Sequence, residues 1–198
     1  MDQAKNFKAK DFFLRAFAFV LYYFSAGFMG NLCAVLLEPL FTLAFFRFPE
    51  IKNIALYIIS ASVMLAAVSF FSMREGYGDT KLLKFSYWRT AFSYAMSGVI
   101  FHFTALRTMD YGQAAGYFYA PHFIPAEIHG IMANYVFLPD IPALCAAGEY
   151  IKRFLAVRQN NLLLSVFFCV IFSAGFYKTG RKKWIAEQRK KIDQTKNK

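Results

Sequence analysis

The sequence predicts an all-α protein, a multi-pass bundle of transmembrane helices with about four spans. Residues 16–37 and 54–73 contain no Lys, Arg, Asp or Glu. Each stretch is long enough to cross a hydrocarbon layer of about 30 Å as a helix that rises about 1.5 Å per residue. The composition is 58% hydrophobic and 20% aromatic, with 18% charged residues. A soluble domain of this size would carry more charge and could not bury so many aromatic rings in one core.

The four expected spans are 16–37, 54–73, 90–106 and 162–177, of which the last two are shorter but equally free of full charge. These spans and their connections use nearly all of the 198 residues. We therefore expect a single integral membrane domain over residues 1–198, without a separate soluble domain. The first apolar stretch is longer than the core of a signal peptide, so we expect it to be a retained span.

The first span has a side made of small residues, formed by Gly27, Gly30, Asn31 and Ala34. Small residues allow the backbones of two helices to approach closely, and an Asn can form a hydrogen bond across such a contact. We expect these four residues to be a helix-packing face. The alternative is the wall of a pore or substrate site.

Two sequences are expected to connect spans. Glu38 and Pro39 should end the first span, and the apolar residues 40–48 should form a short interfacial helix. Residues 74–80 contain two glycines that suit a tight turn, so we expect a solvated loop there. The loop lacks the spacing of a phosphate-binding motif.

The distribution of basic residues favours four spans with both termini on the cytoplasmic side. Cytoplasmic segments of membrane proteins are enriched in Lys and Arg. Four spans place most of the 23 basic residues of the chain on that side. A fifth span at 131–151 would divide the basic residues almost equally between the two sides. A six-span layout, with a hairpin around residues 27–31, gives nearly the same bias as four spans.

A proline-rich segment, residues 108–151, interrupts the pattern of spans. It contains no Lys or Arg but holds four of the six prolines of the chain. Proline inside a helix removes a hydrogen bond and clashes with the preceding turn. We therefore expect short helices that lie in the outer interface or form a re-entrant element, since irregular backbone at membrane depth needs protein or water around it.

A polar cluster is the candidate site for chemistry, because ionisable residues in an apolar, membrane-level setting are candidates for function. Its members are His102 from the third span and His122, Glu127, His129 and Asp140 from the proline-rich segment. They could ligate a metal or act as acid–base groups only if tertiary packing brings them together. Inter-helix hydrogen bonding, helix capping and headgroup contacts are the structural alternatives. We assign no catalytic residue, metal or cofactor.

The C-terminal tail, residues 178–198, is strongly basic and follows the last span directly. Basic residues beside a span attract anionic lipid headgroups, and Trp is enriched at membrane interfaces. We expect a membrane-surface anchor formed by Arg181, Lys182, Lys183 and Trp184. Nucleic acid is not an expected partner.

Three functions remain open from the sequence. The first is a non-enzymatic structural or accessory subunit of a membrane complex, which fits the packing face and the absence of catalytic motifs. The second is a small oligomeric transporter or permease component that uses residues 108–151 as gate or site. The third is a membrane-embedded, metal-dependent enzyme. The expected partners are the lipid bilayer and other membrane subunits or further copies of the chain. We expect the plasma (inner) membrane, with an organelle membrane as the alternative.

Overall fold

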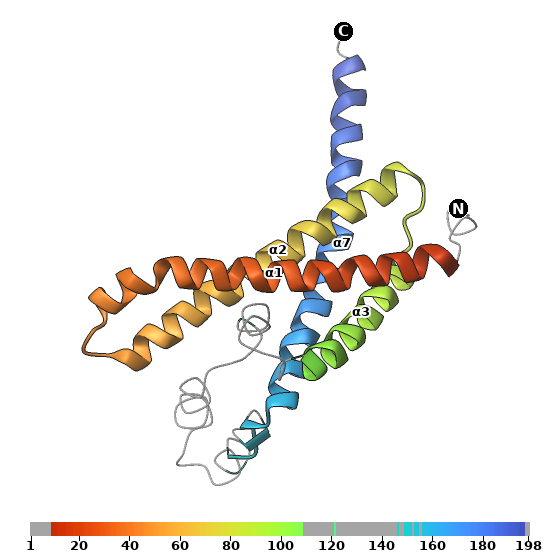
Figure 1. Ribbon diagram of the computed structural model, residues 1–198. Helices are drawn as coiled ribbons and strands as arrows, with labels where there is room; N and C mark the ends of the chain where they lie inside the picture. Colours follow the sequence, from red (N-terminus) through yellow and green to blue (C-terminus); the bar gives the residue numbers. More distant parts are fainter. Residues whose placement is uncertain are drawn as a thin grey trace. The chain divides into compact units, whose positions relative to one another are not determined.

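The structure is a computed structural model that describes residues 9–108, 121, 146, 149–151, 153–154 and 156–196. Four long helices account for almost all of these residues, and none of the described residues forms a strand (Figure 1). The helices are α1 (Ala9–Ala44), α2 (Pro49–Lys81), α3 (Tyr87–Thr108) and α7 (Arg158–Lys196). The all-α prediction is confirmed for this part of the chain. Each of the four expected spans lies inside one helix, while the four-span count stays a prediction.

Three of the helices are long and apolar enough to cross a membrane: Lys10–Ala44, Pro49–Lys81 and Gln159–Thr195. The chain itself buries only 28%, 28% and 33% of their most apolar stretches. Most apolar side chains on these helices therefore face outwards, where lipid or another protein can cover them. This arrangement supports the prediction of a membrane protein.

Helix α1 continues past two points where the sequence suggested a break. Pro39 lies inside the helix, which ends only at Ala44, so the expected end at Glu38 and the separate helix at 40–48 are wrong. The hairpin at residues 27–31 in the six-span alternative is also wrong, because the helix is continuous there. An internal proline costs about 3 kcal/mol. Breaking the helix in an apolar setting would expose several backbone groups, each costing several kcal/mol.

Helix α2 also extends further than expected, because residues 74–80 are helical and do not form a loop. The helix ends in a Schellman motif, in which the Leu83 amide donates to the Thr80 carbonyl (3.2 Å) and the Lys84 amide donates to the Asp79 carbonyl (2.8 Å). Leu83 adopts a positive φ of 55°, a conformation that glycine usually provides at this position. The turn to α3 therefore follows Lys81, after both glycines.

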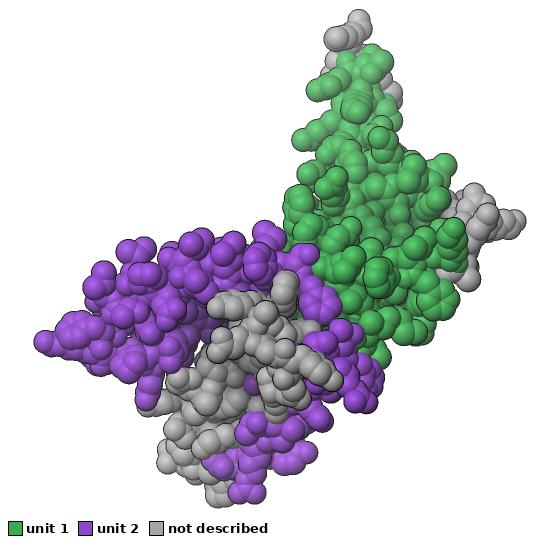
Figure 2. Space-filling model, viewed as in Figure 1, with its two compact units in different colours: residues 1–23, 65–101, 168–198 green, residues 24–64, 102–167 purple. Residues whose placement is uncertain are grey.

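The chain divides into two compact units, coloured separately in Figure 2. Unit 1 comprises residues 1–23, 65–101 and 168–198, and unit 2 comprises residues 24–64 and 102–167.

Unit 1 has an aromatic core to which α1, α3 and α7 all contribute. The fully buried rings include Phe19, Tyr23, Tyr94, Phe101 and Tyr177. The ring centroids of Phe19 and Tyr94 are 4.1 Å apart, and those of Tyr23 and Phe101 are 5.9 Å apart in an edge-to-face arrangement.

In unit 2, α1 and α2 meet at a small-residue contact. Gly30 is buried, and a Cβ atom added there would overlap the backbone oxygen of Ser60. Nearer the ends of these helices, Lys52 Nζ lies 3.8 Å from Glu38 Oε1. Large apolar side chains on the same helices remain exposed, among them Leu36 and Leu43.

Candidate functional site

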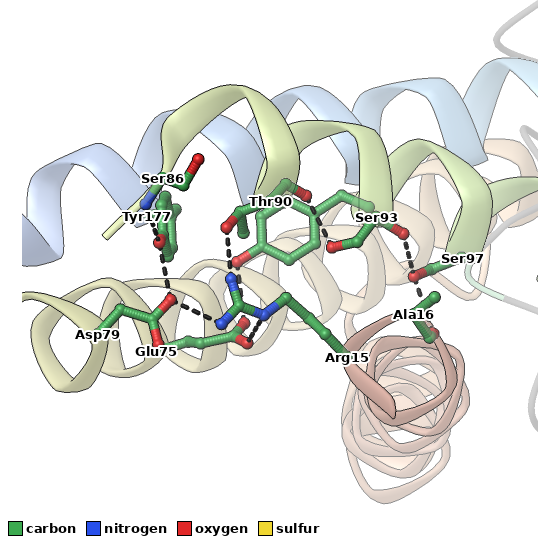
Figure 3. Close-up of polar contacts among 10 residues, drawn as sticks. Arg15, Ala16, Glu75, Asp79, Ser86, Thr90, Ser93, Ser97 and Tyr177 are labelled. Carbon is green, nitrogen blue, oxygen red and sulfur yellow. Dashed lines mark hydrogen bonds and ion pairs between the residues drawn. The ribbon is translucent and has the colours of Figure 1, made fainter. Parts of the chain in front are cut away.

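A buried polar network in unit 1 joins the four long helices around Arg15 of α1. Its guanidinium group contacts both carboxylates of α2, with Nε 2.8 Å from Glu75 Oε1 and Nη2 2.7 Å from Asp79 Oδ2. Its third nitrogen, Nη1, donates to the hydroxyl of Thr90 on α3. Figure 3 shows the guanidinium group held between α2 and α3 by these contacts. All three guanidinium nitrogens therefore have a partner.

Two tyrosine hydroxyls also donate hydrogen bonds to these carboxylates. The hydroxyl of Tyr94 on α3 donates to Glu75 Oε2 (3.0 Å), and the hydroxyl of Tyr177 on α7 donates to Asp79 Oδ2 (2.7 Å). Both tyrosines are fully buried. The Tyr177 hydroxyl also accepts from the Ser86 amide at the turn before α3 (3.4 Å). Asp79 thus accepts from both α1 and α7, so the network links all four helices.

Helical spacing explains why these side chains meet. Glu75 and Asp79 are four residues apart on α2, which places both carboxylates on one face of the helix. Thr90 and Tyr94 have the same spacing on α3. Arg15 lies near the beginning of α1, whereas the carboxylates lie near the end of α2.

Serine hydroxyls extend the polar contact between α1 and α3. Ser97 Oγ lies 2.8 Å from the carbonyl oxygen of Ala16 and 2.7 Å from that of Ser93 on its own helix. Ser93 Oγ in turn donates to the Thr90 carbonyl at 2.8 Å (Figure 3). Ser93 and Ser97 are both fully buried. Small side chains here let α1 and α3 approach closely enough for a hydroxyl to reach the neighbouring backbone.

Helices α2 and α7 cross with their backbones in contact at two glycines. A Cβ atom on Gly76 would overlap the backbone of Tyr177, and one on Gly180 would overlap the backbones of Met73 and Tyr77. This crossing brings the Tyr177 side chain to the level of Asp79. The role of Gly76 is therefore close helix packing, and not the tight turn that the sequence suggested.

The network contains one guanidinium group against two carboxylates. The side chains of Arg15 and Asp79 are 10% exposed, and that of Glu75 is 23% exposed. Buried charges of this kind are tolerated when they are paired and fully hydrogen-bonded. Removing the single positive charge would leave two neighbouring carboxylates without a cation. The network therefore connects α1, α2, α3 and α7 through side-chain contacts.

The polar cluster predicted from the sequence is mostly outside the described residues. His122, Glu127, His129 and Asp140 fall in that part of the chain, so their predicted proximity stays a prediction. His102 lies on α3, and its buried Nδ1 atom has no hydrogen-bond partner among the described residues. Within the described part of the chain, no group of three or more His, Cys, Asp or Glu side chains could hold a metal ion.

The helix-packing face predicted on the first span lies in unit 2. Gly27 and Gly30 are buried, and Asn31 and Ala34 are partly buried. Gly30 packs closely against Ser60 of α2.

The predicted membrane-surface anchor lies on α7, which stays helical to Lys196. Arg181, Lys182 and Lys183 are exposed, and Trp184 is half-buried. The Arg181 guanidinium carbon lies 4.7 Å from the ring centroid of Phe85, in cation–π geometry.

Sequence reasoning missed the network around Arg15. It left Arg15 just outside the first expected span, 16–37, and placed Glu75 and Asp79 in the loop expected at residues 74–80. A signal was present, because two carboxylates spaced by four residues directly follow an uncharged span. Two consecutive spans return the chain to the side on which it began, so the start of the first span and the end of the second lie on the same side of the membrane. An Arg at one and paired carboxylates at the other can then meet.

Comparisons of this chain with protein families, with curated proteins and with solved structures found no match. The interpretation of function therefore depends on the chain's own geometry.

Proposed function

We propose that the chain is a four-span membrane protein that acts as a structural or accessory subunit of a membrane complex. The observation that carries the proposal is the network around Arg15, in which groups from four helices neutralise and hydrogen-bond one another. Such an arrangement holds helices in register. The outward-facing apolar residues of α1 and α2 supply the surface that a neighbouring subunit would cover.

The same network supports an even number of crossings. Arg15 directly precedes the first expected span, Asp79 follows the second, Thr90 begins the third and Tyr177 ends the fourth. Because these four residues are in contact within unit 1, those span ends lie at one level. Both termini would then be on the same side of the membrane, which the excess of basic residues makes the cytoplasmic side. A fifth span before α7 would place Tyr177 at the opposite surface.

The described residues add nothing in favour of the transporter or the enzyme hypothesis. Both depend on residues 108–151, of which the structure describes only Thr108, Pro121, Ala146 and 149–151.

The proposal is tested by photo-crosslinking of the full chain in its native membrane. A photoreactive residue replaces Leu36 or Leu43, which are 68% and 76% exposed on α1. We expect a discrete protein adduct of one size from at least one of these positions. The matched control is Leu162, which is fully buried and should give no adduct with another protein.

Native electrophoresis of the solubilised membranes provides the second measurement. A subunit should migrate well above the mass of the 22.7 kDa chain with its bound detergent. Migration as a monomer, together with adducts to lipid alone at both exposed positions, would contradict the proposal.

A further inference from the structure

Unit 1 has a basic and aromatic pocket between the start of α3 and the tail half of α7. Its volume is about 500 Å³. Three cationic side chains line it from α7, and three aromatic side chains line it from the turn before α3 and from its first residues. These six residues are Lys178, Arg181, Lys182, Phe85, Tyr87 and Trp88, and Ile185 of α7 completes the lining.

The charged side chains that line the pocket are all positive. Lys178, Arg181 and Lys182 lie at positions i, i+3 and i+4, so they share one face of α7. The described residues that line the pocket include no Asp or Glu. Arg181 is already oriented by the ring of Phe85, 4.7 Å away. Three cations on one face of α7, with no carboxylate among the described lining residues, favour a phosphate group, which Arg and Lys bind through charge-assisted hydrogen bonds.

The apolar surroundings favour a lipid as the source of that phosphate. Trp88 is 80% exposed, and the neighbouring turn also exposes Leu82 and Leu83. Exposed Trp and Leu beside basic residues, directly after an apolar span, are typical of the boundary between headgroups and acyl chains. A free phosphate ion would gain nothing from these apolar side chains.

We infer that this pocket binds the phosphate headgroup of an anionic phospholipid, with Lys178, Arg181 and Lys182 as its ligands. The inference rests on the proposed membrane location and is independent of the accessory role. It differs from a diffuse attraction of the whole tail, because only the residues that line the pocket should determine the preference for the anionic lipid.

Fluorescence of Trp88 tests the inference directly. The chain has two Trp residues, so a Trp184→Phe variant leaves Trp88 as the only Trp fluorophore. The full-length protein is reconstituted in phosphatidylcholine nanodiscs with a low mole fraction of dibrominated phosphatidylglycerol or dibrominated phosphatidylcholine. We expect saturable quenching that is clearly stronger for the brominated phosphatidylglycerol. Added inorganic phosphate should leave this difference unchanged.

Two charge-matched triple variants separate the pocket from the tail. Replacing Lys178, Arg181 and Lys182 by Gln should abolish the difference, because each cation near the surface changes the lipid affinity by about fivefold. Replacing Lys183, Lys190 and Lys191 by Gln removes the same charge from residues that do not line the pocket, and should preserve the difference.

Four results would overturn the inference. Equal quenching by the two lipids would exclude headgroup selectivity while leaving the membrane location intact. Equal losses in the two triple variants would point to diffuse attraction. Displacement of the lipid by inorganic phosphate would identify a site for free phosphate. Absence of quenching by either lipid would contradict the membrane placement of Trp88 as well.

Discussion

Unit 1 and the described part of unit 2 are built from the same long helices but are stabilised differently. In unit 1, Arg15, Glu75 and Asp79 form a buried ionic network with hydroxyl groups from α3 and α7. In unit 2, the ion pair between Lys52 and Glu38 has a 3.8 Å separation and a carboxylate that is 56% exposed. The network places four helices in a defined register. The surface pair contributes little, because solvent screens it.

The difference between the units shows what the buried charged side chains contribute to helix packing. A polar contact is directional, so it selects one register where apolar contacts would allow several. The described part of unit 2 relies on close packing at Gly30 and leaves large apolar side chains exposed. Lipid or a partner subunit that covered these side chains would stabilise the helices further. This expectation agrees with the subunit role that we propose.

The largest expected effect comes from Arg15→Met. Loss of the guanidinium group leaves Glu75 and Asp79 buried without a cation, and should lower the free energy of unfolding by about 3–5 kcal/mol. The measurement is an unfolding titration with SDS from mild-detergent micelles, followed by circular dichroism. The matched control is Lys52→Met in unit 2, which should cost less than about 1 kcal/mol. Equal costs for the two variants would remove the distinction between the units.

The glycines at the crossing of α2 and α7 should come next. Gly76→Ala forces a Cβ atom into the Tyr177 backbone and should cost about 1–3 kcal/mol in the same titration. Gly78 lies two residues away on the same helix and has open space around it, so Gly78→Ala should be neutral or stabilise by up to about 1 kcal/mol. Destabilisation by both variants would indicate that residues 74–80 need glycine for backbone freedom, as in a turn.

Asp79→Asn sharpens the description of charge within the network. The amide oxygen can still accept from Tyr177, and Arg15 keeps the carboxylate of Glu75, so one positive and one negative charge remain. We expect a loss of about 1–2 kcal/mol, clearly smaller than that of Arg15→Met. The comparison uses the two variants under identical detergent conditions. A larger loss of stability for Asp79→Asn than for Arg15→Met would mean that the network needs the negative charge of both carboxylates.

The smallest effect is expected at the turn after α2. Leu83→Gly relieves the positive φ of 55° and should raise the free energy of unfolding by about 1 kcal/mol. Leu82→Gly, at the adjacent exposed position, relieves no such strain and should give no gain. Both variants are compared by their thermal midpoints in detergent. A gain from Leu82→Gly alone would contradict the assignment of Leu83 as the residue after the helix end.

Local sequence was sufficient for the existence of the four helices and insufficient for their ends. Uncharged stretches such as 16–37 and 54–73 predict membrane-length helices, because length and apolarity are properties of the segment itself. The ends at Pro39 and at residues 74–80 were wrong, since glycine, proline and carboxylates are ordinary signals for loops. Here Gly76 packs against the backbone of α7, and Glu75 and Asp79 pair with Arg15, so the residues that suggested a loop are accommodated within a helix.

By itself, the sequence determined that the protein is helical, apolar and basic at its C-terminal tail, because each of these properties is carried by neighbouring residues. Only the tertiary structure decided that Arg15, Asp79, Thr90 and Tyr177 meet, because they come from four helices up to 162 residues apart in the chain. It likewise decided that Gly76 serves a helix crossing and that Arg181 faces Phe85. These pairings depend on helix register and crossing, which a local pattern does not contain.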